Sequence, residues 1–137
     1  MSCKPLIDVA TTNSTAVATN GVLPLTTIVR RKGNEINQSG NSIAITDCGS
    51  NYYLVAVTAT FTAPVAGVVT LNLQQNGTNV TGATASTTIT TATTEVRSLS
   101  FNAIVRTFNN TGFDTLTVLN TGVAATFSNI DVIVTKL

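Results

Sequence analysis

Side chains that could carry out acid–base chemistry are few in this chain. The sequence contains no histidine, which removes the commonest general base and the commonest metal ligand. Its carboxylates are scattered, with no pair close in sequence: Asp8, Glu35, Asp47, Glu95, Asp114 and Asp131. Lysine occurs only at positions 4, 32 and 136, and a serine or threonine nucleophile needs a base beside it. We therefore predict that the protein is not an enzyme, with no catalytic residue, no metal and no cofactor.

Two cysteines and one basic cluster are the other features that could be reactive or could bind a charged ligand. Cys3 and Cys48 do not make a disulfide framework. They are interpreted as reduced thiols, with pairing of Cys3 between subunits as the alternative. The run Arg30 to Gly33 is the basic cluster. It is typical of a solvated turn, and a carbohydrate or anion contact is the alternative.

The composition describes a surface that is polar but hardly charged. Hydrophobic residues make up 43% of the 137 and charged residues only 9%, against a usual charged share of about 25%. Threonine, asparagine, serine and glutamine must therefore cover the surface. A net charge of +1 does not steer polyanions, so we expect no nucleic-acid partner. The apolar runs are shorter than a spanning helix needs and no secretion signal is present, so we expect synthesis in a cytoplasm and no membrane partner.

The segment 52–77 indicates how the chain folds. It is typical of a strand, a corner at Pro64, a second strand and a tight turn at Asn76-Gly77. Residues 52–57 are apolar without alternation, which predicts a strand covered on both faces. A small all-β chain has one core, which covers one face. The other face then needs a partner, and a second copy of the same chain is the simplest one.

The rest of the chain favours a β-sandwich or jelly roll of eight to ten strands. Strands around Ile104 and Ile133 share the two-faced pattern of Val55, so we expect all three strands to lie together in one sheet. A strand is also expected over Val22–Val29. Residues 1–20 show little periodicity, and we expect an arm over residues 1–20 and a jelly-roll domain over residues 21–137.

The chain resembles the C1q/tumour-necrosis-factor-like jelly roll carried by bacteriophage structural proteins and bacterial spore-surface proteins. The resemblance covers roughly residues 22–137 and rests on these residues: Arg30, Ile43, Ile45, Gly49, Tyr53, the run from Thr58 to Pro64, Gly67, Leu71, Leu73 and Asn76-Gly77. It implies a ten-stranded antiparallel jelly roll of two sheets that assembles as a compact trimer. The collagen-like stalk and the aromatic-rich apex of some members are missing.

The resemblance also assigns side chains to two places. The expected trimer interface comprises Tyr52, Leu54, Ala56, Ile104, Asp131 and Ile133. The expected core of each subunit comprises Tyr53, Val55, Val57, Phe61, Leu71, Leu73, Phe101 and Val105. Asp131 is interpreted as a polar contact at the threefold axis or at a solvated edge. A calcium ligand on that axis is the alternative, because hard cations prefer clustered oxygen ligands.

The leading functional prediction is a non-enzymatic virion protein: a trimeric capsid decoration or fibre-head protein on the surface of a bacteriophage. Its partners would be other capsid or tail proteins. The arm would dock onto the particle through Lys4, Pro5, Leu6, Ile7 and Val9. One alternative is a host-attachment module that binds surface glycans through the expected loops Thr78–Thr84 and Thr107–Phe113. The other is a spore exosporium protein.

Overall fold

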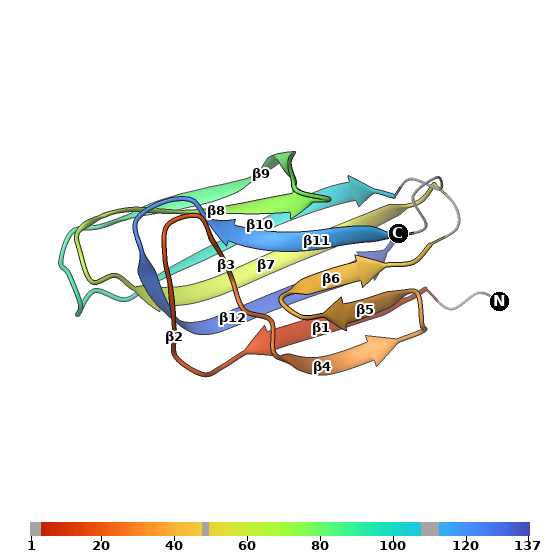
Figure 1. Cartoon of the computed structure of the whole chain (residues 1–137), viewed down its shortest axis with the longest axis horizontal. Helices are drawn as coiled ribbons and strands as arrows, with labels where there is room; N and C mark the ends of the chain where they lie inside the picture. The colour runs from red at the N-terminus through yellow and green to blue at the C-terminus, as the bar shows by residue number, and fades with distance from the viewer. Residues whose placement is uncertain (1–3, 48–49, 108–112) are drawn as a thin grey trace.

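The protein is a sandwich of two antiparallel β-sheets that lie face to face (Figure 1). The computed structural model describes residues 4–47, 50–107 and 113–137, which form twelve strands. Sheet A has the order β10 (Arg97–Arg106), β7 (Tyr52–Thr62), β12 (Ala125–Lys136), β1 (Leu6–Thr11) and β4 (Thr27–Lys32), with β2 (Thr15–Val17) also beside β12. Sheet B has the order β5 (Ile36–Ser39), β6 (Ser42–Ile45), β11 (Asp114–Asn120), β8 (Gly67–Gln75) and β9 (Thr78–Ile89), with β3 (Gly21–Val22) also beside β11.

The predicted fold class is confirmed, since the chain is an antiparallel two-sheet jelly roll. It passes from sheet A to sheet B between β7 and β8, and returns between β9 and β10. The predicted turn at Asn76-Gly77 joins β8 to β9, with φ angles of 53° and 81°, as a tight hairpin turn requires. Among the described residues no helix is long and apolar enough to cross a membrane.

One hydrophobic core fills the space between the sheets. The inward side chains of β7 include Tyr53 and Phe61, both fully buried, and the Phe61 ring lies 5.2 Å from that of Phe127 on β12. Burying each such side chain contributes about 1.5–3 kcal/mol. Of the eight predicted core residues, Phe101 is partly buried and packs against the core, and seven are buried: Tyr53, Val55, Val57, Phe61, Leu71, Leu73 and Val105.

The three strands expected to lie together in one sheet are neighbours, as the sequence predicts. β7 is the middle strand, with β10 on one side and β12 on the other. Their outward residues are apolar at Leu54, Ile104 and Ile133, and several others are polar, such as Asn102 and Thr135. The chain itself therefore covers one face of this group of strands.

The expected N-terminal arm is wrong as a separate unit, and so is the domain boundary at residue 20. β1 lies between β12 and β4 inside sheet A, and Ile7 and Val9 are fully buried. The short alternation of Leu6–Thr11 is a true strand pattern, buried at every second residue. The proposed docking residues Pro5, Ile7 and Val9 are buried and Leu6 is half-buried, which leaves only Lys4 exposed. The segment is part of the domain and is not free to dock elsewhere.

The strand expected over Val22–Val29 is also corrected. β3 ends at Val22 and β4 begins at Thr27, because Pro24 between them has no N–H to donate to a ladder. Leu23 and Leu25 on either side of Pro24 are buried in the core. The intervening residues therefore connect sheet B to sheet A while still contributing apolar side chains.

Gly122 lets the β11–β12 corner lie directly against the backbone of β8. The N–H groups of Thr121 and Val123 donate to the carbonyl oxygens of Thr70 and Val68, both at 2.9 Å. A Cβ atom on Gly122 would lie 2.2 Å from the Val68 carbonyl oxygen, which is an overlap with backbone.

We predict that Gly122→Ala destabilises the fold by roughly 3 kcal/mol, because backbone must move to admit the methyl group. The matched control is Gly40→Ala. Gly40 has a φ of 60° with no atom within 4 Å of its Cβ position, so that variant should lose only about 1–2 kcal/mol. Urea unfolding measures both. A Gly122→Ala protein as stable as Gly40→Ala would contradict this account of the corner.

Candidate functional site

The outward surface of sheet A is the candidate site, and we call the outward side chains of β1, β7, β10 and β12 the sheet A face. It holds every residue of the expected trimer interface: Tyr52, Leu54, Ala56, Ile104, Asp131 and Ile133. Tyr52 is 53% exposed and Ile104 is 59% exposed, which is high for large apolar side chains. The core leaves this side of the sheet uncovered.

The strand register brings these side chains together. Leu54 on β7 lies opposite Ile104 on β10 and Thr135 on β12. In the next outward row, Ala56 lies opposite Asn102 and Ile133. Directly opposite residues in an antiparallel pair have Cβ atoms about 4.5–5.5 Å apart. The apolar residues therefore form one continuous patch. That this patch contacts a second copy stays a prediction.

Strand β1 adds residues to the sheet A face that we do not predict from the sequence. Leu6 lies opposite Thr135, Asp8 opposite Ile133 and Ala10 opposite Asp131. All three are half-buried. The signal that could have identified them is the alternation of Leu6, Asp8 and Ala10 with the inward Ile7 and Val9, which is short enough to be mistaken for an irregular lead-in.

Asp8 and Asp131 form the charged part of the sheet A face. Each has an Oδ1 atom that is buried and has no hydrogen-bond partner. Desolvation by burial, together with the hydrogen bond and the negative charge of Asp8, raises the pKa of Asp131 to about 7. Two adjacent carboxyl groups in this setting favour a form in which one of them keeps its proton.

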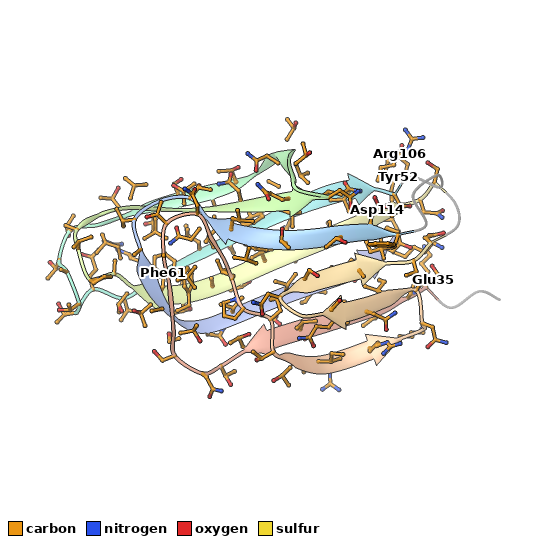
Figure 2. All side chains as sticks on the ribbon, in the orientation of Figure 1. Glu35, Tyr52, Phe61, Arg106 and Asp114 are labelled. Atoms are coloured by element: carbon orange, nitrogen blue, oxygen red, sulfur yellow. The ribbon has the colours of Figure 1, made fainter. Side chains whose placement is uncertain are left out.

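A second polar cluster joins three loops and strands at one end of the sandwich. The Tyr53 hydroxyl donates to Asp47 Oδ2 at 2.6 Å, and Asn51 Nδ2 donates to the same oxygen at 2.7 Å. Lys136 Nζ lies 3.3 Å from both Asp47 Oδ2 and Glu35 Oε2. Glu35, at this end of the sandwich in Figure 2, thereby connects β5 to the last residues of β12. The cluster holds the end of the fold together.

The charges in this cluster change how easily its members lose their protons. Burial, the hydrogen bond to Asp47 and the nearby carboxylates raise the pKa of Tyr53. Desolvation by itself would lower the pKa of Lys136. The hydrogen bonds and negative charges of Asp47 and Glu35 outweigh it, so the pKa of Lys136 is raised. Both groups therefore keep their protons to higher pH in the folded chain.

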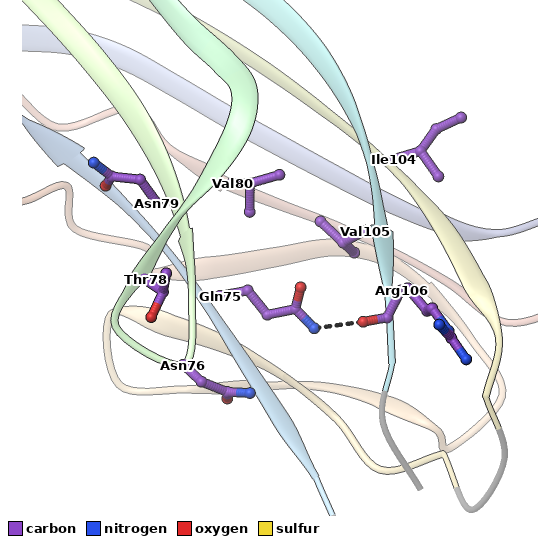
Figure 3. Close-up of a pocket in the computed structure, with 8 residues that line it drawn as sticks. All are labelled: Gln75, Asn76, Thr78, Asn79, Val80, Ile104, Val105 and Arg106. Carbon is purple, nitrogen blue, oxygen red and sulfur yellow. Dashed lines mark hydrogen bonds between the residues drawn. The ribbon is translucent and has the colours of Figure 1, made fainter.

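A groove of about 390 Å³ lies between the β8–β9 hairpin and β10 (Figure 3). Three of the polar side chains that line it are engaged within the fold. Gln75 Nε2 donates to the Arg106 carbonyl oxygen at 2.7 Å, Asn76 Nδ2 donates to Asp114 Oδ1 at 2.7 Å, and Asn79 Oδ1 accepts from Gln74. The segment expected to be a glycan-binding loop, Thr78–Thr84, belongs to strand β9, and residues 108–112 of the other expected loop lie outside the described residues.

Metal-binding clusters are not found in the part of the chain that the structure describes, since no three acidic or cysteine side chains gather there. Cys3 and Cys48 both lie outside the described residues, so their pairing stays a prediction. The calcium alternative for Asp131 concerns an axis shared by three copies, so it stays a prediction.

We predict that Tyr53→Phe lowers the free energy of unfolding by about 1–3 kcal/mol, because Asp47 loses a buried hydrogen-bond donor. The matched control is Tyr52→Phe, which removes a hydroxyl from the neighbouring exposed ring and should change stability little. Urea unfolding at neutral pH distinguishes them. Equal losses in the two variants would contradict the role of the cluster.

The same cluster predicts the sign of the alkaline response. Above about pH 10 the unfolded chain releases the Tyr53 proton while the folded chain keeps it, so stability falls as pH rises. The fall should be smaller in Tyr53→Phe than in the unchanged protein. Urea midpoints between about pH 8 and 11 measure this difference.

The jelly roll has counterparts among solved structures, whereas no family model and no curated protein matches the sequence. Murine APRIL in a crystal structure at pH 5.0 has a TM-score of 0.71 at 16% identity, covering 98% of this chain and 100% of that one. The globular domain of zebrafish complement 1qA protein has a TM-score of 0.65 at 10% identity, covering 96% and 95%. PRD1 vertex protein P5 has a TM-score of 0.61 at 12% identity, covering 99% and 98%. At these identities the likeness shows the fold, and the chain is a TNF/C1q-like jelly roll.

Proposed function

We propose that the protein is a non-enzymatic structural protein of a bacteriophage particle that assembles as a homotrimer through the sheet A face. The observation that carries this proposal is the continuous apolar patch around Leu54, Ile104 and Ile133 on the outside of a sandwich whose core is already complete. Exposed apolar patches on small domains mark surfaces where another molecule binds.

A second and a third copy of the chain are the occupants that fit the patch. The net charge of +1 means that copies repel one another little. A closed ring of three copies covers the same patch on every chain and leaves no free site for further growth. TNF- and C1q-like domains are typically trimers, which supports the same number.

The virion assignment draws support from PRD1 vertex protein P5, a phage protein with this fold. The polar, weakly charged remainder of the surface also suits a particle exterior. In this proposal the trimer is made in the host cytoplasm and joins the capsid or tail as a decoration protein or fibre head. Its partners there are other virion proteins.

We predict that Ile104→Glu gives a monomer, because three buried carboxylates would face the apolar patch of neighbouring copies. Ile104 is 59% exposed in the single chain, so folding should be unaffected. The matched control is Val68→Glu, which changes a 46% exposed side chain on the outward surface of sheet B and should stay trimeric. Light scattering after gel filtration gives the masses. A trimeric Ile104→Glu protein would contradict the proposed interface.

The virion assignment predicts that the chain is present in purified phage particles of its source, in a copy number divisible by three. Quantitative mass spectrometry of gradient-purified particles measures this number. The monomeric variant Ile104→Glu should be missing from particles formed when it replaces the unchanged protein. Particles that lack the unchanged chain would contradict the assignment and leave the trimer itself unaffected.

A further inference from the structure

Two aspartates lie inside the surface through which we propose that the chain self-associates. Asp8 is on β1 and Asp131 is on β12, and these strands are paired in sheet A. Their register places Asp8 opposite Ile133 and Asp131 opposite Ala10, so the two carboxyl groups are diagonal neighbours on the outward face. Their side chains are close enough to hydrogen bond to each other. An apolar contact surface is an unusual place for two adjacent acids.

No ion pair compensates the two negative charges among the described residues. The Oδ1 atom of each aspartate is buried and has no hydrogen-bond partner. The neighbours of Asp131 across the strand pairs are Thr58 on β7 and Ala10 on β1, neither of which titrates. Two buried, unpaired carboxylates are costly, whereas one carboxylic acid can donate a hydrogen bond to one carboxylate.

The charged groups that face the pair from the surrounding strands are few. Arg30 on β4 lies opposite Asp8 in the register, and Lys32 lies in the next outward row, opposite Leu6. No ion pair joins either of them to the aspartates among the described residues. On β7 the outward residues near the pair are Ala56 and Thr58, and the paired part of β2, Thr15–Val17, has no titratable side chain. Proton sharing is thus the means that the fold itself offers for keeping these two groups together.

We propose that Asp8 and Asp131 share one proton in each chain and that self-association of the sheet A face depends on this proton, so that assembly is favoured at mildly acidic pH and weakened at mildly alkaline pH. This inference rests on the proposed self-association. Covering the face with another copy removes the water that still reaches the pair, which makes the doubly charged form less favourable still.

The direction of the pH dependence follows from the raised pKa. Asp131 in the folded chain has a pKa raised to about 7 by burial and by Asp8, against about 3.9 for an aspartate in an unfolded chain. That difference governs folding. For assembly the reference is the single folded chain, whose Asp131 already has a pKa of about 7, and covering the pair raises this pKa further. Association is therefore strongest below about pH 7 and weakens as the pH rises above it. The trimer would hold one such pair in each of its three chains. Assembly should therefore take up protons, and the loss of these protons should dissociate the trimer cooperatively.

The test is sedimentation velocity of the unchanged chain at about pH 5.5, 7 and 8.5, at constant ionic strength and with EDTA present. We expect association at least tenfold weaker at the highest pH than at the lowest. Asp131→Asn should associate equally well at all three values, because its amide donates a hydrogen bond to Asp8 without titrating. Asp8→Asn, which removes the other member, should behave in the same way. The control Glu95→Gln changes a carboxyl between β9 and β10 that is bound by Thr90, Thr91 and Arg97, and it should keep the pH dependence.

Several outcomes would overturn the inference. Equal association of the unchanged chain at every pH would do so while leaving the trimer intact. Recovery of assembly at alkaline pH on adding calcium in place of EDTA would point to a shared cation and not a shared proton. A monomer at every pH would remove the proposed trimer. In that case carboxyl NMR titration of the single chain still tests the pair, since an ordinary aspartate pKa for Asp131 would refute the shared proton directly.

Discussion

The structure depends on one geometric constraint: a single sandwich has one core, and that core can bury only one face of each sheet. Three neighbouring strands, β10, β7 and β12, each carry a large apolar side chain on the outward face as well as on the inward one: Ile104, Leu54 and Ile133. The inward residues of these strands, such as Tyr53 on β7 and Phe127 on β12, lie in the core. Their large outward apolar side chains Leu54, Ile104 and Ile133 then lie outside that core, 37–59% exposed. The proposed assembly follows from this exposed apolar surface. The low net charge is consistent with it, because copies of the chain repel one another little.

The two outward surfaces of the sandwich differ in a way that supports this view. On sheet B, polar side chains on neighbouring strands bond to each other: Thr70 with Ser86 at 2.9 Å, and Thr84 with Asn72 at 2.6 Å. These polar side chains therefore have hydrogen-bond partners within the chain and can also face water. On sheet A the corresponding positions hold Leu54, Ile104 and Ile133, and the two acids beside them have unpartnered buried oxygens. This difference supports the proposal that a partner covers sheet A.

Most of this architecture could be predicted from the sequence, because strand patterns of period two carry the needed information when they are long. The apolar runs near Val55, Ile104 and Ile133 are enough to place three distant strands in one sheet. Asn76-Gly77 predicts the β8–β9 hairpin of the other sheet. Short strands and contacts between distant residues cannot be predicted in this way. Leu6–Thr11 is too brief to distinguish from an arm, and the pairing of Asp8 with Asp131 joins residues more than a hundred positions apart, which only the strand register reveals. The closed corner at Gly122 likewise depends on a contact with β8 that no local pattern encodes.

The most direct test of the central claim is the mass of the unchanged chain in solution, measured by light scattering across a dilution series at mildly acidic pH. The covered sheet A face predicts a particle of three chains, each of 14.2 kDa, that persists on dilution. A stable mass of one chain at every concentration would contradict it. The apolar outward surface of sheet A would then have to be covered by a different protein.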